Sequence, residues 1–260
     1  MSIVQRRLVF LTIGMLLGGL GAWFYWPHFA GLGAKQVLAQ KRPPREPNLD
    51  AFANFLDSVV CEGGVDYALA RKHQADLDTF LADLAFCSPG QWSPSKRLAM
   101  LVNAYNAFVI KGVLDQDIQQ GIAEAGANHK FFREKRYNLA GIAVSLNGLE
   151  LELIRPLNPN CHFMLNCASK SCPQLRQQPF REKLLSQQID LARTQFLSDK
   201  QKNFCDPQSG IWHLSSLFTW YQDDFGGRKD MVAMIRAVTG WPEPTQIQYL
   251  PYDWSLNNCP

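Results

Sequence analysis

The chain has 260 residues, of which 26 are basic, 23 are acidic and 47% are hydrophobic. This composition excludes wholesale disorder, and the lack of a long run of like charge argues against a nucleic-acid-binding surface. The first 40 residues hold three basic residues and no acid, so the remaining 220 carry equal charge of both signs, enough chain for one large domain.

An uncharged apolar run of 19 residues extends from Leu8 to Trp26, directly after Arg6-Arg7. A bilayer core needs about 20 apolar residues, and positive charge before the run predicts a cytoplasmic N-terminus. Cleavage after Ala39 is the competing interpretation, weakened by its distance from the run. We predict a cytoplasmic segment over 1–7, a transmembrane signal anchor over 8–26, a linker over 27–47 and a globular domain over 48–260 on the extracytoplasmic (periplasmic or lumenal) side.

The globular part shows mainly helical periodicity, with a few separated strands and no regular alternation of strand and helix. The elements expected in chain order are a helix from the Asn48 cap to Gly63-Gly64, helices over about 67–86 and 95–114, a strand over 137–146, a short helix over 148–155, a strand over 162–165, a helix over 182–197, a strand over 211–214, a helical turn over 216–221 and a helix over 231–238. This pattern predicts a helix-rich single α+β domain with a small sheet.

The seven cysteines are an odd number, so at least one stays unpaired within the chain. In an oxidising compartment we expect most of them to be bonded. The four cysteines outside residues 161–173 could form two bridges, for example Cys61–Cys87 and Cys205–Cys259. Sequence alone does not fix that connectivity.

Residues 161–173 hold three cysteines and one of only five histidines. A thiolate is a nucleophile, and a nearby imidazole is the usual group that deprotonates it. We therefore predict Cys172 as the nucleophile and His162 as its base. Cys167 is the alternative nucleophile, and a Cys167–Cys172 disulfide is equally open.

Other polar residues could complete such a site. Glu150 or Asn103 would orient the imidazole, as a third group does in catalytic triads. His213 is a reserve base, and Asp224 would cap a helix or pair with a nearby base. The candidate substrate-binding residues are Tyr105, Asn106, Cys167 and Ser171. Plainer interpretations are that the asparagines bond loop backbone, that Tyr105 is a core residue and that Glu150 pairs with Arg155.

Several motifs together resemble a known family over roughly 51–239. They are Val65-Asp66-Tyr67, Val102-Asn103-Ala104-Tyr105-Asn106-Ala107, Leu149-Glu150 with Ile154-Arg155, His162-Phe163 through Ser171-Cys172-Pro173, and Trp220-Tyr221 with Asp224-Phe225. In this order they are similar to the domain-of-unknown-function family 547 (DUF547). The family brings no settled activity. Its general look is similar to papain-like or transglutaminase-like cysteine enzymes, which implies a cysteine-peptidase-like fold with a central helix and then a strand that starts with His.

The chain departs from the family pattern at three places. Leu101 stands where an aromatic residue is usual, and Leu151 stands where a histidine often follows Glu150. The basic residue usual just before His162 is absent. If the missing histidine is catalytic in relatives, this chain is impaired or depends on His162 alone, which favours a binding protein.

The lead hypothesis is a thiol-dependent hydrolase or acyltransferase of the cell envelope. The alternative is a non-catalytic envelope module that binds a peptide or small molecule such as a thiol. A zinc site of His162, Cys167 and Cys172 is a third hypothesis, disfavoured because the spacing lacks a Cys-x-x-Cys knuckle. We expect no cofactor, no resident metal and no nucleic-acid partner, and the membrane as a partner through the N-terminal helix.

Overall fold

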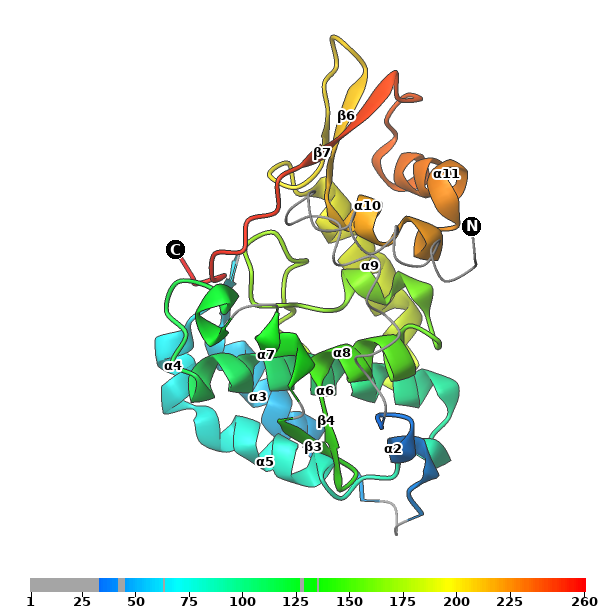
Figure 1. The fold of residues 1–260 in the computed structure, drawn as a ribbon. Coiled ribbons are helices and arrows are strands. Elements are labelled where there is room, and N and C mark those ends of the chain that lie inside the picture. The colour runs from blue at the N-terminus through cyan, green and yellow to red at the C-terminus, as the bar shows by residue number, and fades with distance from the viewer. Residues whose placement is uncertain (1–32, 42–44, 63, 127–128, 135) are drawn as a thin grey trace, which may run out of the picture. The chain divides into compact units, whose positions relative to one another are not determined.

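The computed structural model describes residues 33–41, 45–62, 64–126, 129–134 and 136–260, all within one compact unit (Figure 1). The predicted anchor over 8–26 lies outside the described residues. The described part of the linker contains the short helix α2 (Gln36–Ala39), whose Val37 side chain is buried.

The first part of the domain is helical. Helix α3 (Leu49–Val59) begins where Asn48 Oδ1 accepts the Ala51 N–H at 3.0 Å, as predicted. A hairpin of β1 (Val60–Cys61) and β2 (Gly64–Val65) follows. The single helix predicted over 67–86 is instead two, α4 (Tyr67–Lys72) and α5 (Gln74–Leu84), because His73 leaves helical geometry with φ −97° and ψ 14°.

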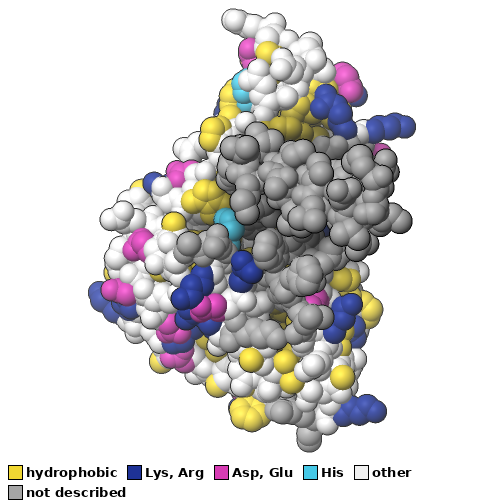
Figure 2. All heavy atoms as spheres, viewed as in Figure 1, with side chains coloured by type: hydrophobic (Ala, Val, Ile, Leu, Met, Phe, Trp, Pro, Cys, Tyr) yellow, Lys and Arg dark blue, Asp and Glu magenta, His cyan; other side chains and the backbone are white. Residues whose placement is uncertain are grey.

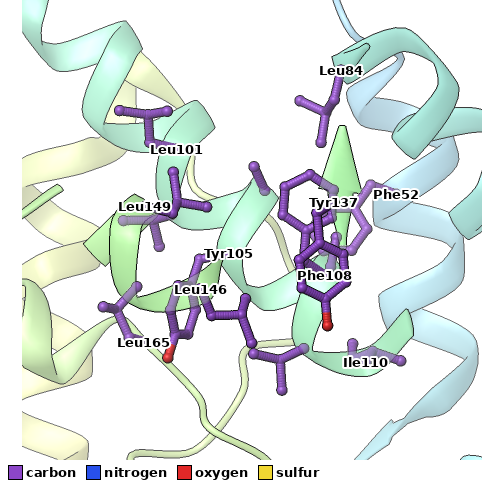
Figure 3. Close-up of a cluster of buried hydrophobic side chains, with 14 of the residues drawn as sticks. Phe52, Leu84, Leu101, Tyr105, Phe108, Ile110, Tyr137, Leu146, Leu149 and Leu165 are labelled. Atoms are coloured by element: carbon purple, nitrogen blue, oxygen red, sulfur yellow. The ribbon is translucent and has the colours of Figure 1, made fainter. Parts of the chain in front are cut away.

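The central helix is α6 (Pro94–Asp115), which follows the 3₁₀ turn η1 (Pro89–Gln91). Ser93 caps it by accepting the Lys96 N–H, and Pro94 stands at the first helical position, where it loses no bond. Figure 3 shows Leu101, Tyr105 and Phe108 of this helix among buried neighbours. Within the described ranges, α6 alone is long and apolar enough to cross a membrane, and 89% of its apolar window is buried, as in a core helix.

Short elements cover this helix. They are η2 (Ile122–Ala125), α7 (Lys130–Arg133), the hairpin of β3 (Tyr137–Leu139) and β4 (Ile142–Val144), α8 (Leu146–Gly148) and the π-helical η3 (Leu149–Ile154). The strand predicted over 137–146 is thus a hairpin, because Ala140 and Gly141 adopt positive φ and reverse the chain.

The strand predicted over 162–165 is wrong. Residues Pro159–Phe163 form the 3₁₀ helix η4, and irregular chain follows. Asn158 Oδ1 accepts the Asn160 N–H at 2.8 Å, and Pro159 stands at the first helical position. A short buried apolar run is compatible with a strand or with a helix, and here the capping by Asn158 and Pro159 favours the helix.

The C-terminal part contains η5 (Glu182–Leu184), α9 (Leu185–Ser198), β5 (Phe204–Cys205), β6 (Ile211–Ser215), α10 (Leu217–Trp220), η6 (Gln222–Phe225), α11 (Gly227–Thr239) and β7 (Gln246–Leu250). The three strands form one sheet in the order β5-β6-β7. Strand β6 pairs antiparallel with β5 and parallel with β7, with Ile211 opposite Gln246. Neither β5 nor β7 was predicted from the sequence.

The buried side chains form two clusters. The first core gathers around α6, mostly from the elements between α2 and η4, and also includes Leu185 of α9 and Leu256 of the C-terminal tail. The second core gathers around α9, β6, α10 and α11, and its members are Phe163, Ala192, Phe196, Leu197, Trp212, Leu214, Leu217, Phe218, Phe225, Met231, Val232 and Ile235. The prediction of a helix-rich α+β domain is confirmed, although the strands of the described residues form three small sheets rather than one.

Candidate functional site

Asparagine side chains hold the loop over 164–173 against α6. Asn106 Nδ2 donates to the Met164 carbonyl at 3.0 Å, and its Oδ1 accepts the Asn166 N–H at 2.9 Å. Asn166 Nδ2 in turn donates to the Pro173 carbonyl at 2.8 Å, which ties the two ends of the loop together. These paired bonds satisfy backbone groups that burial would otherwise leave unbonded.

A disulfide between Cys167 and Cys172 closes this loop. Cys172 is 4% exposed, whereas Cys167 is partly exposed. The Cys172 Sγ accepts the Cys167 N–H at 2.8 Å and the Tyr252 hydroxyl at 3.2 Å. Two donors therefore reach the buried sulfur, and the Tyr252 hydroxyl also lies 3.2 Å from Cys167 Sγ, which is 2.9 Å from Ser169 Oγ.

The C-terminal tail brings Tyr252 to the disulfide. The tail runs from β7 back to the helical part of the domain (Figure 1), and the Lys170 N–H donates to the Ser255 carbonyl at 2.9 Å. A second disulfide, Cys61–Cys259, fixes the end of the tail to the β1–β2 hairpin. Among the described residues these two are the disulfides, so both example pairings from the sequence, Cys61–Cys87 and Cys205–Cys259, are wrong.

Aromatic rings surround Tyr252. Its ring centroid lies 4.7 Å from that of Trp220 and 4.5 Å from that of Trp254. The Trp220 and Trp254 rings are 5.8 Å apart and close to parallel, at 21°. The disulfide thus lies beside a cluster of three partly buried aromatic residues.

His162 lies in a separate cluster of charged residues. Its Nε2 is 2.6 Å from Asp224 Oδ2, and its Nδ1 is 3.8 Å from Glu150 Oε1. The imidazole stacks on the Tyr221 ring at 3.6 Å between centroids. Arg155 Nη2 lies 2.7 Å from Asp224 Oδ2, so Asp224 bonds two cationic or potentially cationic groups.

Burial and pairing shift the pKa values of the two acids in this cluster, Glu150 and Asp224, in opposite directions. Burial raises the pKa of Glu150, although His162 and Arg155 partly oppose the shift. Burial alone would also raise the pKa of Asp224, but hydrogen bonds from His162 and Arg155 lower it below its ordinary value. Burial and the nearby Glu150 carboxyl raise the pKa of the Cys161 thiol. The Cys161 thiol is therefore a poor source of thiolate.

The structure brings some predicted residues together and separates others. It places Glu150 beside His162, but it pairs both ring nitrogens of His162 with carboxylates and bonds Cys172 to Cys167. Asn103 bonds both the N–H and the carbonyl of Phe180, at 2.9 and 2.8 Å.

The remaining candidates have structural partners. Tyr105 is 3% exposed, and burial and the Glu150 carboxyl raise its pKa. Ser171 Oγ accepts the Asp253 N–H at 2.8 Å. His213 stacks on Phe204 at 4.3 Å, on the strand where it was predicted.

Sequence reasoning missed the role of Tyr252 and Trp254 at the disulfide. Tyr252 lies 80 residues from Cys172 along the chain, and no local pattern connects them. Asp224 was interpreted as a cap or a partner of a base, and it does bond His162. The signal for Asp224 was its place in the Trp-Tyr-x-x-Asp-Phe segment.

The described residues contain no group of three or more His, Cys, Asp or Glu side chains placed to hold a metal ion. The hypothetical zinc ligands are engaged elsewhere, since Cys167 and Cys172 bond each other and His162 bonds Asp224. Basic and acidic side chains are interspersed over the described part of the face in Figure 2.

Comparison with known proteins gives one finding. The chain matches no curated protein and no solved structure. Residues 89–197, from η1 to α9, match the family model described as "Protein of unknown function, DUF547". The matched stretch includes α6, His162 and the Cys167–Cys172 loop, but neither Asp224 nor the tail with Tyr252. Over these residues the chain is similar to the DUF547 family, as the motifs indicated, and the papain-like resemblance is left without support.

Proposed function

We propose that this protein carries out thiol–disulfide exchange at Cys167 and Cys172. The observation that carries the proposal is the asymmetry of the pair. Cys167 is partly exposed, while Cys172 is buried and its sulfur alone accepts the Cys167 N–H; the Tyr252 hydroxyl lies 3.2 Å from each sulfur. Exchange is faster when the sulfur that leaves is stabilised as a thiolate.

A single turnover needs no external oxidant, because the Cys167–Cys172 disulfide itself accepts the two electrons. A substrate thiolate attacks Cys167 Sγ, a new disulfide forms between substrate and Cys167, and the bond to Cys172 breaks with its electron pair on Cys172 Sγ. A second substrate thiolate then attacks the substrate sulfur of this mixed disulfide and releases Cys167. Two substrate thiols are thereby oxidised to a disulfide, and the protein gains a dithiol.

Two donors stabilise the leaving thiolate. The Cys167 N–H is fixed by the loop, and the Tyr252 hydroxyl stays protonated because burial raises its pKa. Hydrogen bonds to a charged group contribute about 1.5–3 kcal/mol each. Together they would lower the pKa of the Cys172 thiol in the reduced protein.

A thiol-dependent hydrolase or acyltransferase is the second candidate. The same donors favour it, because a thiolate on Cys172 would also be the nucleophile of acyl transfer once the disulfide is reduced. His162 could act as its base only after leaving the carboxylates of Asp224 and Glu150. A cysteine-peptidase-like mechanism would therefore require a rearranged, reduced form.

We propose an extracytoplasmic location with a membrane anchor over residues 8–26, which makes the membrane a partner. The two disulfides support this location, because disulfides persist mainly in oxidising compartments. The ligand would be a peptide or a small thiol.

The test treats the purified protein with graded dithiothreitol and locates each thiol by alkylation and peptide mass spectrometry. Exchange predicts that Cys167 and Cys172 become alkylated together, and that Cys172 reacts rapidly below pH 8. After full reduction, oxidised glutathione should leave a mixed disulfide on Cys167 in the Cys172→Ser variant. In the wild type, Cys172 should displace the glutathione and restore the Cys167–Cys172 bond.

Cys205→Ser is the matched control, since Cys205 is a partly exposed thiol outside the loop. A Cys167–Cys172 bond that persists until the protein unfolds would contradict exchange and favour the binding module. Acylation of reduced Cys172 by an activated ester, without exchange, would favour the hydrolase.

A further inference from the structure

The aromatic cluster of Trp220, Tyr252 and Trp254 is joined to the disulfide through one atom. The Tyr252 hydroxyl lies 3.2 Å from Cys167 Sγ and 3.2 Å from Cys172 Sγ. A substrate chain whose sulfur reaches Cys167 would therefore bring its neighbouring side chains close to these rings.

The cluster is held in place from both ends. Trp220 ends α10, whose preceding residue Ser216 donates through Oγ to the Leu250 carbonyl at 2.5 Å. The tail is fixed by the Asp253 N–H to Ser171 Oγ and by the disulfide at Cys259. Rings fixed in this way lose little conformational entropy when a ligand packs on them.

The charges beside the cluster include both signs. Asp253 stands between Tyr252 and Trp254 in the chain. Hydrogen bonds from Ser255 and the charge of the nearby Lys170 lower the pKa of the Asp253 carboxyl. The three rings themselves carry no formal charge. Such a surface favours apolar and aromatic side chains, whereas a small anionic thiol gains little from it.

We infer that the substrate is a polypeptide cysteine flanked by aromatic or large aliphatic side chains, as in an unfolded chain, rather than a small anionic thiol such as glutathione. This inference rests on the proposed thiol–disulfide exchange. Trp220 and Trp254 would bind the flanking side chains, and Cys167 would accept the sulfur.

The experiment measures how fast reduced dithiol peptides open the Cys167–Cys172 bond of the oxidised protein. One peptide carries two cysteines, each flanked by Phe. The other carries Ser in place of each Phe. Acid quenching, alkylation and peptide mass spectrometry give the rates. Two aromatic contacts predict a reaction of the Phe peptide that is at least about fivefold faster.

Variants separate binding from chemistry. Trp220→Ala or Trp254→Ala should bring the ratio of the two peptide rates close to one, with each peptide rate first divided by the variant's own rate of reduction by dithiothreitol. Trp254→Phe, which keeps a ring and guards against misfolding of the alanine variant, should retain most of the preference. Trp241→Ala is the matched control, because Trp241 packs on Trp212 at 5.4 Å in the second core.

Equal rates for the two peptides, together with normal reduction by dithiothreitol, would overturn the inference and leave the proposed exchange standing. Quenching of tryptophan fluorescence by a soluble glycan, with equal peptide rates, would overturn it in favour of a carbohydrate surface. Failure of dithiothreitol to open the bond in the folded protein would overturn both proposals.

Discussion

The two hydrophobic cores are built in different ways. The first surrounds α6, whose 22 residues bond their own backbone and bury side chains on every face. The second is assembled from shorter elements, of which α9 with 14 residues is the longest, and depends on aromatic contacts, with Phe163 5.8 Å from Phe196 and 5.5 Å from Phe225. A long helix tolerates local change, whereas short elements depend on one another for their position.

The two cores meet at the short helix η4. Cys161 belongs to the first core and Phe163 to the second, with His162 between them. The tail crosses the same boundary, because Tyr252 packs against the second core and Leu256 lies in the first. Both the charged cluster and the disulfide therefore require the two cores to be correctly placed.

The largest loss of stability is expected at Phe163, the residue of η4 that packs in the second core. Phe163→Ala removes a ring that is 1% exposed and should lower the free energy of unfolding by about 3–5 kcal/mol. Phe86→Ala is the matched control and should change little, since Phe86 is 53% exposed. Urea denaturation measures both. A loss below about 1 kcal/mol for Phe163→Ala would show that η4 does not anchor the second core.

The charged cluster should contribute the next largest effect. Asp224→Asn removes the carboxylate that Arg155 and His162 both bond. It should lower the free energy of unfolding by about 3 kcal/mol at pH 7. Because pairing lowers the pKa of Asp224, its stabilisation is present above about pH 4 and is lost as the pH falls through the lowered pKa.

The difference in the free energy of unfolding between the wild type and Asp224→Asn should therefore shrink as the pH falls from 7 to 3. Asp253→Asn is a control for an exposed acid, whose pKa is also lowered, by hydrogen bonds from Ser255. A constant difference between the wild type and Asp224→Asn at every pH would contradict the pairing.

A smaller effect is expected in the first core, at Gly112 of α6. A Cβ there would lie 2.3 Å from the Tyr137 hydroxyl. Gly112→Ala should therefore overpack the core and lower the free energy of unfolding by about 1–3 kcal/mol. That hydroxyl is buried and has no hydrogen-bond partner among the described residues. Tyr137→Phe alone should be close to neutral, and it should recover part of the loss in the double variant. Additive effects would show that the two groups do not touch.

The same difference between the cores explains what the sequence could predict. Helix α6 was located to within a residue at each end, because its apolar spacing and the Ser93-Pro94 start are local signals. The 3₁₀ helix at His162 was taken for a strand, because a short apolar run carries no period. Tyr252 was missed because tertiary contacts, rather than local spacing, bring it to Cys172. The disulfide connectivity depends on the same long-range folding.

The most direct measurement compares the wild type with Tyr252→Phe. The rate at which dithiothreitol opens the Cys167–Cys172 bond would be followed together with the pH dependence of Cys172 alkylation in the reduced protein. Loss of the hydroxyl removes one of the two donors to Cys172 Sγ, so the account predicts about tenfold slower opening and a raised pKa of the Cys172 thiol. An unchanged rate and an unchanged pKa would contradict the claim that this protein stabilises Cys172 as the leaving thiolate.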